Sequence, residues 1–595
     1  MKRKSHSMNR FTLLLVVLLA IIVINGKGQT RDQQPRGMST DMEKLQLLSE
    51  LQSLNTQSDR LNSPLARARA KAEIASALWH LDQEEAKRIL TNAYKLTLPE
   101  EAEQEKSRAR AIGADMGFPS ETERARTDVR TRILQVAGQD QAYANLLVKL
   151  GSESLGRHEA HLSNALLARQ ALVSGDTKVA GQYIVDAIEV EPTLTLAGPL
   201  IQEIAKKDRA AADALIVKYI ERLRGIPFSF SQSTQRIFFV LLDLVFPGTL
   251  GMNRQVQVQP PGPAVMKAYA SYVVQSFGQL IQRDPGSLVR LRYVILTAGL
   301  PVKQYAPELM PAYMELERLS RGGGEGNPIQ TLEEIKGSLQ RNRQQQLDTA
   351  LDKETIDASL IEPAVRRGMF DKARKAAENL PEGDRKTQLI DLINAQEAVS
   401  FRAKGNIAGA ERLAEQLRTP PRIFEVYAAL INNCGEDKLC KLPLLNKALK
   451  QIKAAESVPV IAPENTPAGL ITTQRELDTK LSFLSKLAVI AATVDDTFTR
   501  AALADVVSAI NHTTVDAELG RLGFDVELFR LCAQKDEVYA QSLALGVTNS
   551  LRQIAALSAI DEWKAKELKK KEAEQQLLKK KVSYLGLPQG SAPRL

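Results

Sequence analysis

Two cysteines that lie six positions apart form the most specific local feature of the sequence. Cys434 and Cys440 flank the segment GEDKL, whose glycine and acidic residues are typical of a turn. In an exported protein, two thiols this close favour a disulfide that ties together the ends of two helices, and the alternative is two separate buried thiols. We expect the disulfide, and because the closed loop is short we expect only local reinforcement of the turn.

The other residues capable of chemistry give weaker signals. His158 and His161 lie on either side of Glu159, but a zinc-protease helix needs two histidines four positions apart, and here the spacing is three. We therefore expect a solvated helix and no metal site at these histidines. Cys532 lies among apolar helix positions, which predicts a core thiol and not a nucleophile.

No nucleophile elbow, phosphate-binding loop or dinucleotide fingerprint occurs in the sequence. The glycines of 322–326 follow a predicted helix and not a strand, so they indicate a linker and not a phosphate cradle. Carboxylates are abundant, but sequence alone cannot pair them across a cleft. The sequence thus predicts no catalytic residue, no metal and no cofactor.

The elements that carry these residues are predicted to be helical hairpins. In segment 401–417, FRAKGNIAGAERLAEQL, a turn at Gly405 precedes a helix in which Ala410 begins an apolar stripe. Thirty-seven residues earlier, Gly368 and Ala373 occupy the same places. Glycine accepts left-handed backbone angles at a turn, and alanine lets two helices approach closely.

Two looser copies of this unit occur nearer the N-terminus. In one, Gly175 precedes Ala180; in the other, Leu81 replaces the glycine before Ala86. A single hairpin cannot bury its apolar stripe, so repeated hairpins are expected to stack. The positions that we expect to pack between helices are Ala86, Ala180, Gly368, Ala373, Gly405 and Ala410.

At these positions the chain resembles the tetratricopeptide repeat family, whose units are helix–turn–helix with small residues at the contacts. The resemblance covers about half of the chain, the spacing departs from 34 residues, and the Trp-Leu-Gly-Tyr signature of that family is not intact. It implies an all-α fold in which antiparallel helical hairpins stack as an irregular array. An irregular helical bundle is the alternative, because such bundles also place glycine at turns and alanine at contacts.

Composition limits the partners that we expect. The net charge of +9 is carried by the two ends, since residues 1–28 contribute five uncompensated Lys/Arg and residues 561–595 contribute four. The body between them is neutral, and aromatic residues make up only 5% of the chain. Both features argue against nucleic-acid binding, and the low aromatic content also argues against sugar-binding clefts. We expect a solvated helix for the lysine-rich 564–581, with binding to anionic lipid or acidic partners as the alternative.

The first 28 residues have the pattern of an export signal. A basic stretch precedes the apolar run 11–24, FTLLLVVLLAIIVI, and small residues follow it. The run is short for a membrane span. We expect an exported protein, periplasmic or extracellular, cleaved after Gly28. An uncleaved anchor formed by residues 11–24 is the alternative, and it would be the chain's only membrane attachment.

Composition also predicts the domain boundaries. The glycines of RGGGEGNP and a proline-rich stretch mark two linkers. The predicted order is a signal or anchor (1–28), a flexible leader (29–39), an N-terminal helical repeat domain (40–320), a Gly-rich linker (321–330), a central tetratricopeptide-like block (331–454), a Pro-rich linker (455–469), a C-terminal helical block (470–563), and a charged helix with a disordered tail (564–595).

These features predict a non-enzymatic scaffold that binds a protein or peptide partner on its helical surface. One alternative is a hydrolase or lyase with carboxylates in a cleft of the array. Another is a structural envelope protein held by its N-terminal segment. The sequence does not identify the partner.

Overall fold

The chain is all-α in the part that the computed structural model describes. The described residues are 40–98, 121–155, 157–190, 196–226, 232–246, 259–283, 292, 294–320, 349–351, 356–455, 480–512 and 517–584, and they contain helices and turns but no strand. The predicted signal (1–28), leader (29–39), glycine-rich linker (321–330) and all but Ala455 of the proline-rich linker lie outside these ranges, as does the end of the tail.

The N-terminal part of the array runs from residue 40 to residue 320. Its elements are α2 (Thr40–Ser58), α3 (Pro64–Leu78), α4 (Gln83–Leu96), α6 (Glu121–Ala137), α7 (Gln141–Leu155), α8 (Arg157–Val173), α9 (Thr177–Val190), α10 (Ala197–Lys207), α11 (Arg209–Arg224), α12 (Gln232–Val245), α13 (Pro263–Arg283), α15 (Gly299–Tyr305), η1 (Pro307–Leu309) and α16 (Met310–Ser320).

The C-terminal part continues in the same style to residue 584. Its elements are η2 (Ala358–Leu360), α18 (Ile361–Arg366), α19 (Phe370–Glu378), α20 (Asp384–Ala403), α21 (Ile407–Ala414), α22 (Pro420–Asn433), α23 (Lys438–Ala454), α24 (Lys480–Ala492), α25 (Asp496–His512), η4 (Ala517–Leu519), α26 (Glu527–Ala533), α27 (Glu537–Leu545) and α28 (Ser550–Tyr584). None of the helices in the described ranges is both long and apolar enough to cross a bilayer.

The chain divides into two compact units. The first holds residues up to Glu50 together with those from Lys564 onward, and the second holds Leu51–Trp563. In the first unit the start of α2 pairs with the C-terminal half of α28, through Lys571–Glu43 at 3.3 Å and Lys564–Glu50 at 3.7 Å. The residue numbers rise on one helix as they fall on the other, so the two helices are antiparallel.

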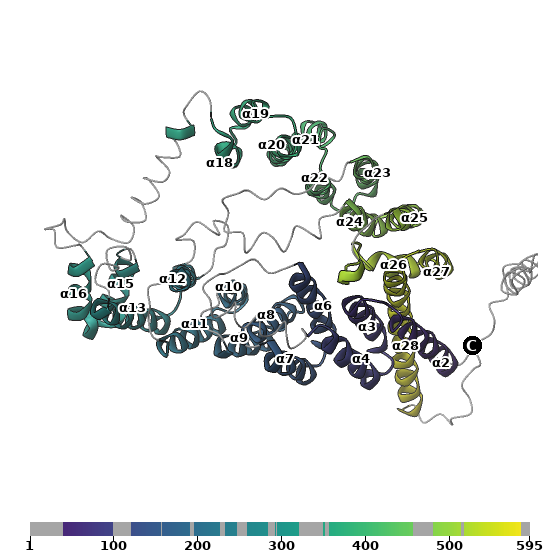
Figure 1. The fold of residues 1–595 in the computed structure, drawn as a ribbon, viewed down its shortest axis with the longest axis horizontal. Helices are drawn as coiled ribbons and strands as arrows, with labels where there is room; N and C mark the ends of the chain where they lie inside the picture. Colours follow the sequence, from purple (N-terminus) through teal and green to yellow (C-terminus); the bar gives the residue numbers. More distant parts are fainter. Residues whose placement is uncertain are drawn as a thin grey trace, which may run out of the picture. The chain divides into compact units, whose positions relative to one another are not determined.

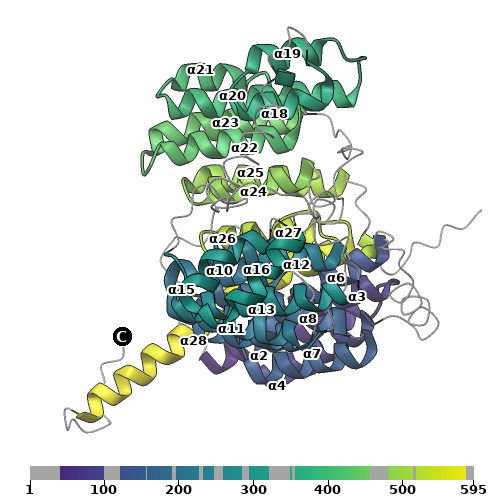
Figure 2. The same cartoon turned by 90° about the vertical axis from the view of Figure 1, so that its left-hand side faces the viewer.

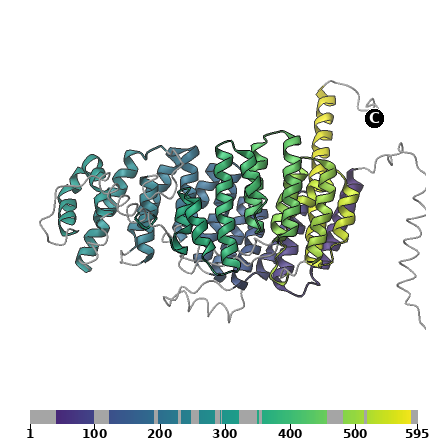
Figure 3. The same ribbon diagram turned by 90° about the horizontal axis from the view of Figure 1, so that it is seen from above.

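Helices of the second unit form two layers, each built from alternate helices. From α18 to α27, consecutive helices pack as hairpins, and α20, α22, α24 and α26 also contact one another in turn. We call these four helices the first layer, and their hairpin partners α21, α23, α25 and α27 the second layer (Figure 1). Figures 2 and 3 show α20, α21, α22 and α23 from two other directions, with their axes side by side. The same alternation relates α6, α8, α10 and α12 to α7, α9, α11 and α13.

An acidic or amide residue begins most of the second helices of these hairpins. In seven of these second helices the side chain accepts a hydrogen bond from the backbone N–H three residues later, at 2.8 to 3.1 Å. Such an N-cap satisfies one of the N–H groups that a helix start leaves without a partner. The seven capping residues are Asp82, Asp140, Asp176, Asp208, Asn406, Asp495 and Asp536.

The residue four positions after the cap lies against the neighbouring helix. It is a fully buried alanine in six of these seven helices, and Thr499 in the seventh. A small side chain here lets the two helices of a hairpin approach closely, which gives the array its close packing. The six alanines are Ala86, Ala144, Ala180, Ala212, Ala410 and Ala540.

Glycine is needed at only some of the turns. Gly175, Gly368 and Gly405 have φ between +75° and +84°, the left-handed region in which glycine has no steric cost. Other hairpins turn without a glycine, as at Leu81-Asp82 and Lys207-Asp208. The acidic cap is therefore the more regular mark of this repeat.

Segments from both ends of the second unit pack against each other. Helix α3 contacts η4, and Ser63, the N-cap of α3, donates its hydroxyl hydrogen to the carbonyl of Glu518. Gly520 follows at φ +73°, where a Cβ would come within 2.8 Å of the Leu65 carbonyl oxygen and 2.9 Å of Val129. This close approach joins parts of the chain that are about 450 residues apart in sequence.

Candidate partner-binding surface

The first-layer helices α20, α22 and α24 share a partly exposed side. Each helix buries one side against the rest of the array, while half-buried residues recur at helical spacing on another side. Apolar and polar residues both contribute to this side. We call this side the first-layer face, with apolar members Leu392, Val399, Phe424, Ala428 and Val489 and polar members Gln396, Glu425 and Lys486.

An aromatic pair covered by a lysine joins α22 to α24 within this face. The ring centroids of Phe424 and Phe483 are 5.5 Å apart, with an interplanar angle of 42°. The ammonium of Lys486 lies 4.7 Å from the Phe483 centroid and 5.9 Å from that of Phe424. Cation–π attraction of this kind holds the lysine in place while its charge stays near the surface.

A fixed polar group joins α20 to α22 beside the aromatic pair. Gln396 donates a hydrogen bond to the Glu425 carboxylate at 3.1 Å, and Arg422 pairs with the other oxygen of that carboxylate at 2.5 Å. The three side chains thereby hold one another in position. Half-buried apolar residues with a few oriented polar groups are typical of surfaces that bind an extended or helical peptide.

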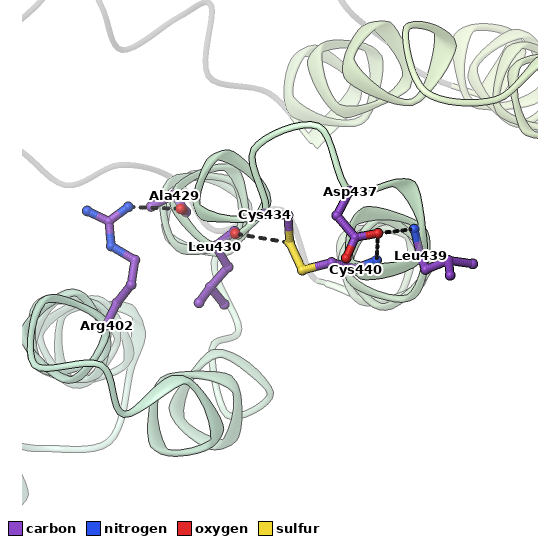
Figure 4. The surroundings of a disulfide bond; sticks show 7 residues. All are labelled: Arg402, Ala429, Leu430, Cys434, Asp437, Leu439 and Cys440. Atoms are coloured by element: carbon purple, nitrogen blue, oxygen red, sulfur yellow. Dashed lines mark hydrogen bonds between the residues drawn. A yellow bond between two sulfur atoms is a disulfide. The ribbon is translucent and has the colours of Figure 1, made fainter.

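The Cys434–Cys440 disulfide closes the turn that follows α22. The two sulfur atoms are 1.97 Å apart, with Cys434 at the end of α22 and Cys440 in the first turn of α23 (Figure 4). Asp437 accepts hydrogen bonds from the backbone N–H groups of Leu439 and Cys440 at 2.9 and 3.3 Å. The turn is therefore held by a helix cap as well as by the sulfur bridge.

The predicted packing residues lie inside the hairpins or at their turns. Ala86, Ala180, Ala373 and Ala410 are fully buried, and Gly368 and Gly405 have positive φ at hairpin turns. They support the array and take no part in the first-layer face.

His161 and Cys532, two of the side chains considered above for chemistry, are buried in the fold. The expected solvated helix is wrong for His161, which is fully buried with its Nδ1 2.9 Å from the carbonyl oxygen of Ala187; the side chain of His158 lies outside the described residues. Cys532 is buried, and burial raises the pKa of its thiol to about 11. Such a thiol stays protonated at neutral pH and is a poor nucleophile. No cluster of metal-ligating side chains occurs within the described ranges.

A buried carboxylate links α3 to α6. Arg132 forms a forked contact with Glu73, with its Nη2 2.7 Å and its Nε 3.1 Å from carboxylate oxygens, and Arg69 lies 2.8 Å away. Burial would raise the pKa of Glu73, but the charges of Arg132 and Arg69 outweigh it and lower that pKa to about 2. The carboxylate stays ionised at neutral pH, so it stabilises the fold but cannot act as a general acid there.

Neither the first-layer face nor this ion pair was predicted from the sequence. Arg132 is 59 residues from Glu73, and Glu425 is 29 residues from Gln396. The sequence signal for the face was the apolar residues at helical spacing on α20 and α22, because one side of each helix carries more apolar residues than a solvated helix needs. Which side faces a neighbouring helix follows only from the stacking.

The chain has little detectable similarity to known proteins. No protein-family model matches the chain, and no curated protein matches it. A solved circular tandem repeat protein, with novel repeat topology and enhanced subunit contact surfaces, matches at 14% identity and a TM-score of 0.13, over 86% of this chain and 98% of that chain. At that TM-score the similarity carries no conclusion, and the helical repeat fold of this chain rests on the packing described above.

Proposed function

We propose that the protein is an exported, tetratricopeptide-like scaffold that holds a protein or peptide partner on its first-layer face. One observation carries the proposal: half-buried apolar residues extend across three neighbouring first-layer helices, beside polar groups that are already fixed in position. Neighbouring helices bury enough of Phe424 and Val489 to order them and leave part of each side chain accessible. An ordered surface of this kind loses little conformational entropy on binding.

Blocking the face tests this proposal without removing any packing. Ala428 is half-buried on α22, so Ala428→Arg places a bulky charged side chain on the face. The matched control is Ala210→Arg on α11, where the native residue is exposed. Each variant is expressed in the source cells, affinity-purified and analysed by quantitative mass spectrometry. We expect proteins recovered with the wild type and with the control to fall at least tenfold with Ala428→Arg. Equal recovery with both variants would contradict the proposal.

A further inference from the structure

The C-terminal half of α28 packs one side against α2 and leaves the rest exposed. Ala565 is fully buried and Leu568 is 4% exposed, and these two residues mark the side of α28 that packs. From Ala573 to Leu578 every side chain is exposed, including Leu577 at 57%. The helix continues to Tyr584.

The helical register keeps the acidic residues of this segment out of one sector. Up to Leu578, at about 100° per residue, a sector about 120° wide holds Lys566, Lys569, Lys570, Ala573 and Leu577. We call these five residues the basic face; its sector is adjacent to Ala565 and roughly opposite Leu568. The acidic residues of the segment all fall outside this sector: Glu567, Glu572 and Glu574.

We propose that the basic face of α28 docks on the surface of an anionic lipid bilayer. Segment 564–584 contains eight lysines and no arginine. Lysine suits the diffuse charge of lipid headgroups, whereas arginine is the usual choice for forked contacts to individual phosphates in nucleic acids. Lysine side chains can also keep their ammonium groups in the headgroup layer while their stems lie along the apolar boundary.

The exposed leucine distinguishes a bilayer from the other anionic partners. Leu577 lies on the basic face and, in sequence, between Lys570 and the lysines of 579–581. An apolar side chain among lysines can enter the boundary between headgroups and acyl chains, as in helices that lie in the membrane interface. A nucleic acid offers no apolar layer for it, and the segment contains only one aromatic residue for stacking on bases. In the sequence the acidic residues alternate with the lysines, which suggests a solvated helix. Because the segment is one continuous helix, however, the acidic residues lie outside the sector of the basic face.

Vesicle sedimentation tests the docking. The chain from Gln29 onward keeps every described residue and omits the apolar run, so it is mixed with vesicles of phosphatidylcholine alone or with one-third phosphatidylglycerol. We expect binding to the anionic vesicles to be at least about 10-fold stronger than to the neutral ones, and to weaken strongly between about 0.1 M and 0.5 M salt. Equal binding to both kinds of vesicle would overturn the proposal.

Two variants assign the binding to the basic face. Lys566→Gln, Lys569→Gln and Lys570→Gln together should lower the affinity for anionic vesicles at least about 10-fold. Leu577→Gln should remove the part of the binding that persists at high salt. The control, Lys375→Gln with Lys404→Gln and Lys438→Gln, makes the same change of charge at exposed lysines elsewhere and should bind like the wild type.

The remaining outcomes would each overturn the proposal. One is an equal loss with the control variant, which would show a general effect of charge. Another is tighter binding to duplex DNA, or to an acidic polypeptide, than to the anionic vesicles. Far-UV circular dichroism of every variant shows whether a loss of binding reflects a loss of helix.

Discussion

Individual polar residues determine where the helices of this protein begin. Asp208 is representative: its backbone N–H donates to the Ile204 carbonyl at 2.7 Å and ends α10, while its side chain accepts from the Ala211 N–H at 3.0 Å and begins α11. One residue thus sets both ends of a turn that contains no glycine. The seven N-caps of this type lie in separate hairpins, so their contributions to stability are expected to add.

Replacing one of these caps should have a modest, measurable effect. Asp208→Ala removes the acceptor for the Ala211 N–H and should lower the free energy of unfolding by about 1 kcal/mol. The measurement is urea denaturation followed by circular dichroism. Asp208→Asn keeps a capping oxygen and should remain close to the wild type. A loss as large for asparagine as for alanine would contradict the capping role.

The buried carboxylate Glu73 gives the protein a defined acid sensitivity. Its folded-state pKa of about 2 lies below its ordinary value of 4.5, so its contribution to stability is complete above pH 4.5 and is lost as the pH falls toward 2. Glu73→Gln should remove this pH-dependent stabilisation, which is about 3 kcal/mol for a shift of this size. Denaturation at pH 7, 4 and 3 measures it as the gap between wild type and variant.

A matched substitution separates this ion pair from general effects of charge. Glu84 lies nearby in sequence, but its side chain is 86% exposed and its pair with Lys87 is on the surface. Glu84→Gln should change the stability by less than about 1 kcal/mol and leave the pH profile unaltered. If Glu73→Gln and Glu84→Gln gave the same profile, the ion pair with Arg132 would not be the source of acid sensitivity.

The array is built from helical hairpins, and each turn is stabilised by several weak interactions. In the turn between α22 and α23, the Asp437 cap and the disulfide act on the same few residues. Salt bridges then join successive helices of the second layer, as between Lys447 of α23 and two carboxylates of the α21 end, Glu411 and the C-cap residue Glu415, at 3.1 and 2.8 Å. Loss of one of these interactions should therefore destabilise a hairpin without unfolding it.

Removing the disulfide tests how much one such feature contributes to a hairpin turn. Replacing Cys434 and Cys440 with serine should lower the stability by no more than about 2 kcal/mol, because the loop is short. Adding a reductant should shift the wild-type denaturation midpoint to that of the variant and leave the variant unchanged. Intact mass measured without a reductant should show two hydrogens fewer than in the reduced chain. Unchanged mass on reduction would show that the bridge does not form.

The sequence predicted these elements better than it predicted their surfaces. Ser63 followed by Pro64 is a sequence pattern typical of a helix start, and in the structure Ser63 caps α3 and Pro64 is its first residue. The two clearest copies of the repeat have a glycine at the turn, Gly368 and Gly405, and the prediction relied on it. The acidic N-cap recurs more regularly, but it was not used. The first-layer face escaped prediction because its members come from three helices, and their alignment depends on how the hairpins stack.

Packing between distant segments holds the second unit together as a whole. The contact of α3 with η4 joins the beginning of this unit to its end, and Gly520 lies at the closest approach. Stacked repeats are otherwise stabilised mainly by their neighbours, so a contact between distant repeats couples segments that would unfold separately.

Gly520→Ala should break this coupling. A Cβ would meet the Leu65 carbonyl oxygen, and alanine is strained at φ +73°, so we expect a loss of about 1 to 3 kcal/mol. Hydrogen exchange should speed up in α3 as well as around residue 520. Gly435→Ala is the control, because its φ is also positive and no atom lies near its Cβ. Faster exchange confined to the altered turn in both variants would contradict the coupling.

We propose that the first-layer face contacts a partner, and site-specific photo-crosslinking in the source cells can detect that contact. A photoreactive residue is placed at Asn432, which is exposed on α22 beside the face, or at Arg412, which is exposed on second-layer helix α21. We expect crosslinks from position 432 to one recurrent protein and none to it from position 412. Crosslinks to that protein from both positions, or from position 412 alone, would contradict the proposal, as would the absence of any crosslinked protein at position 432.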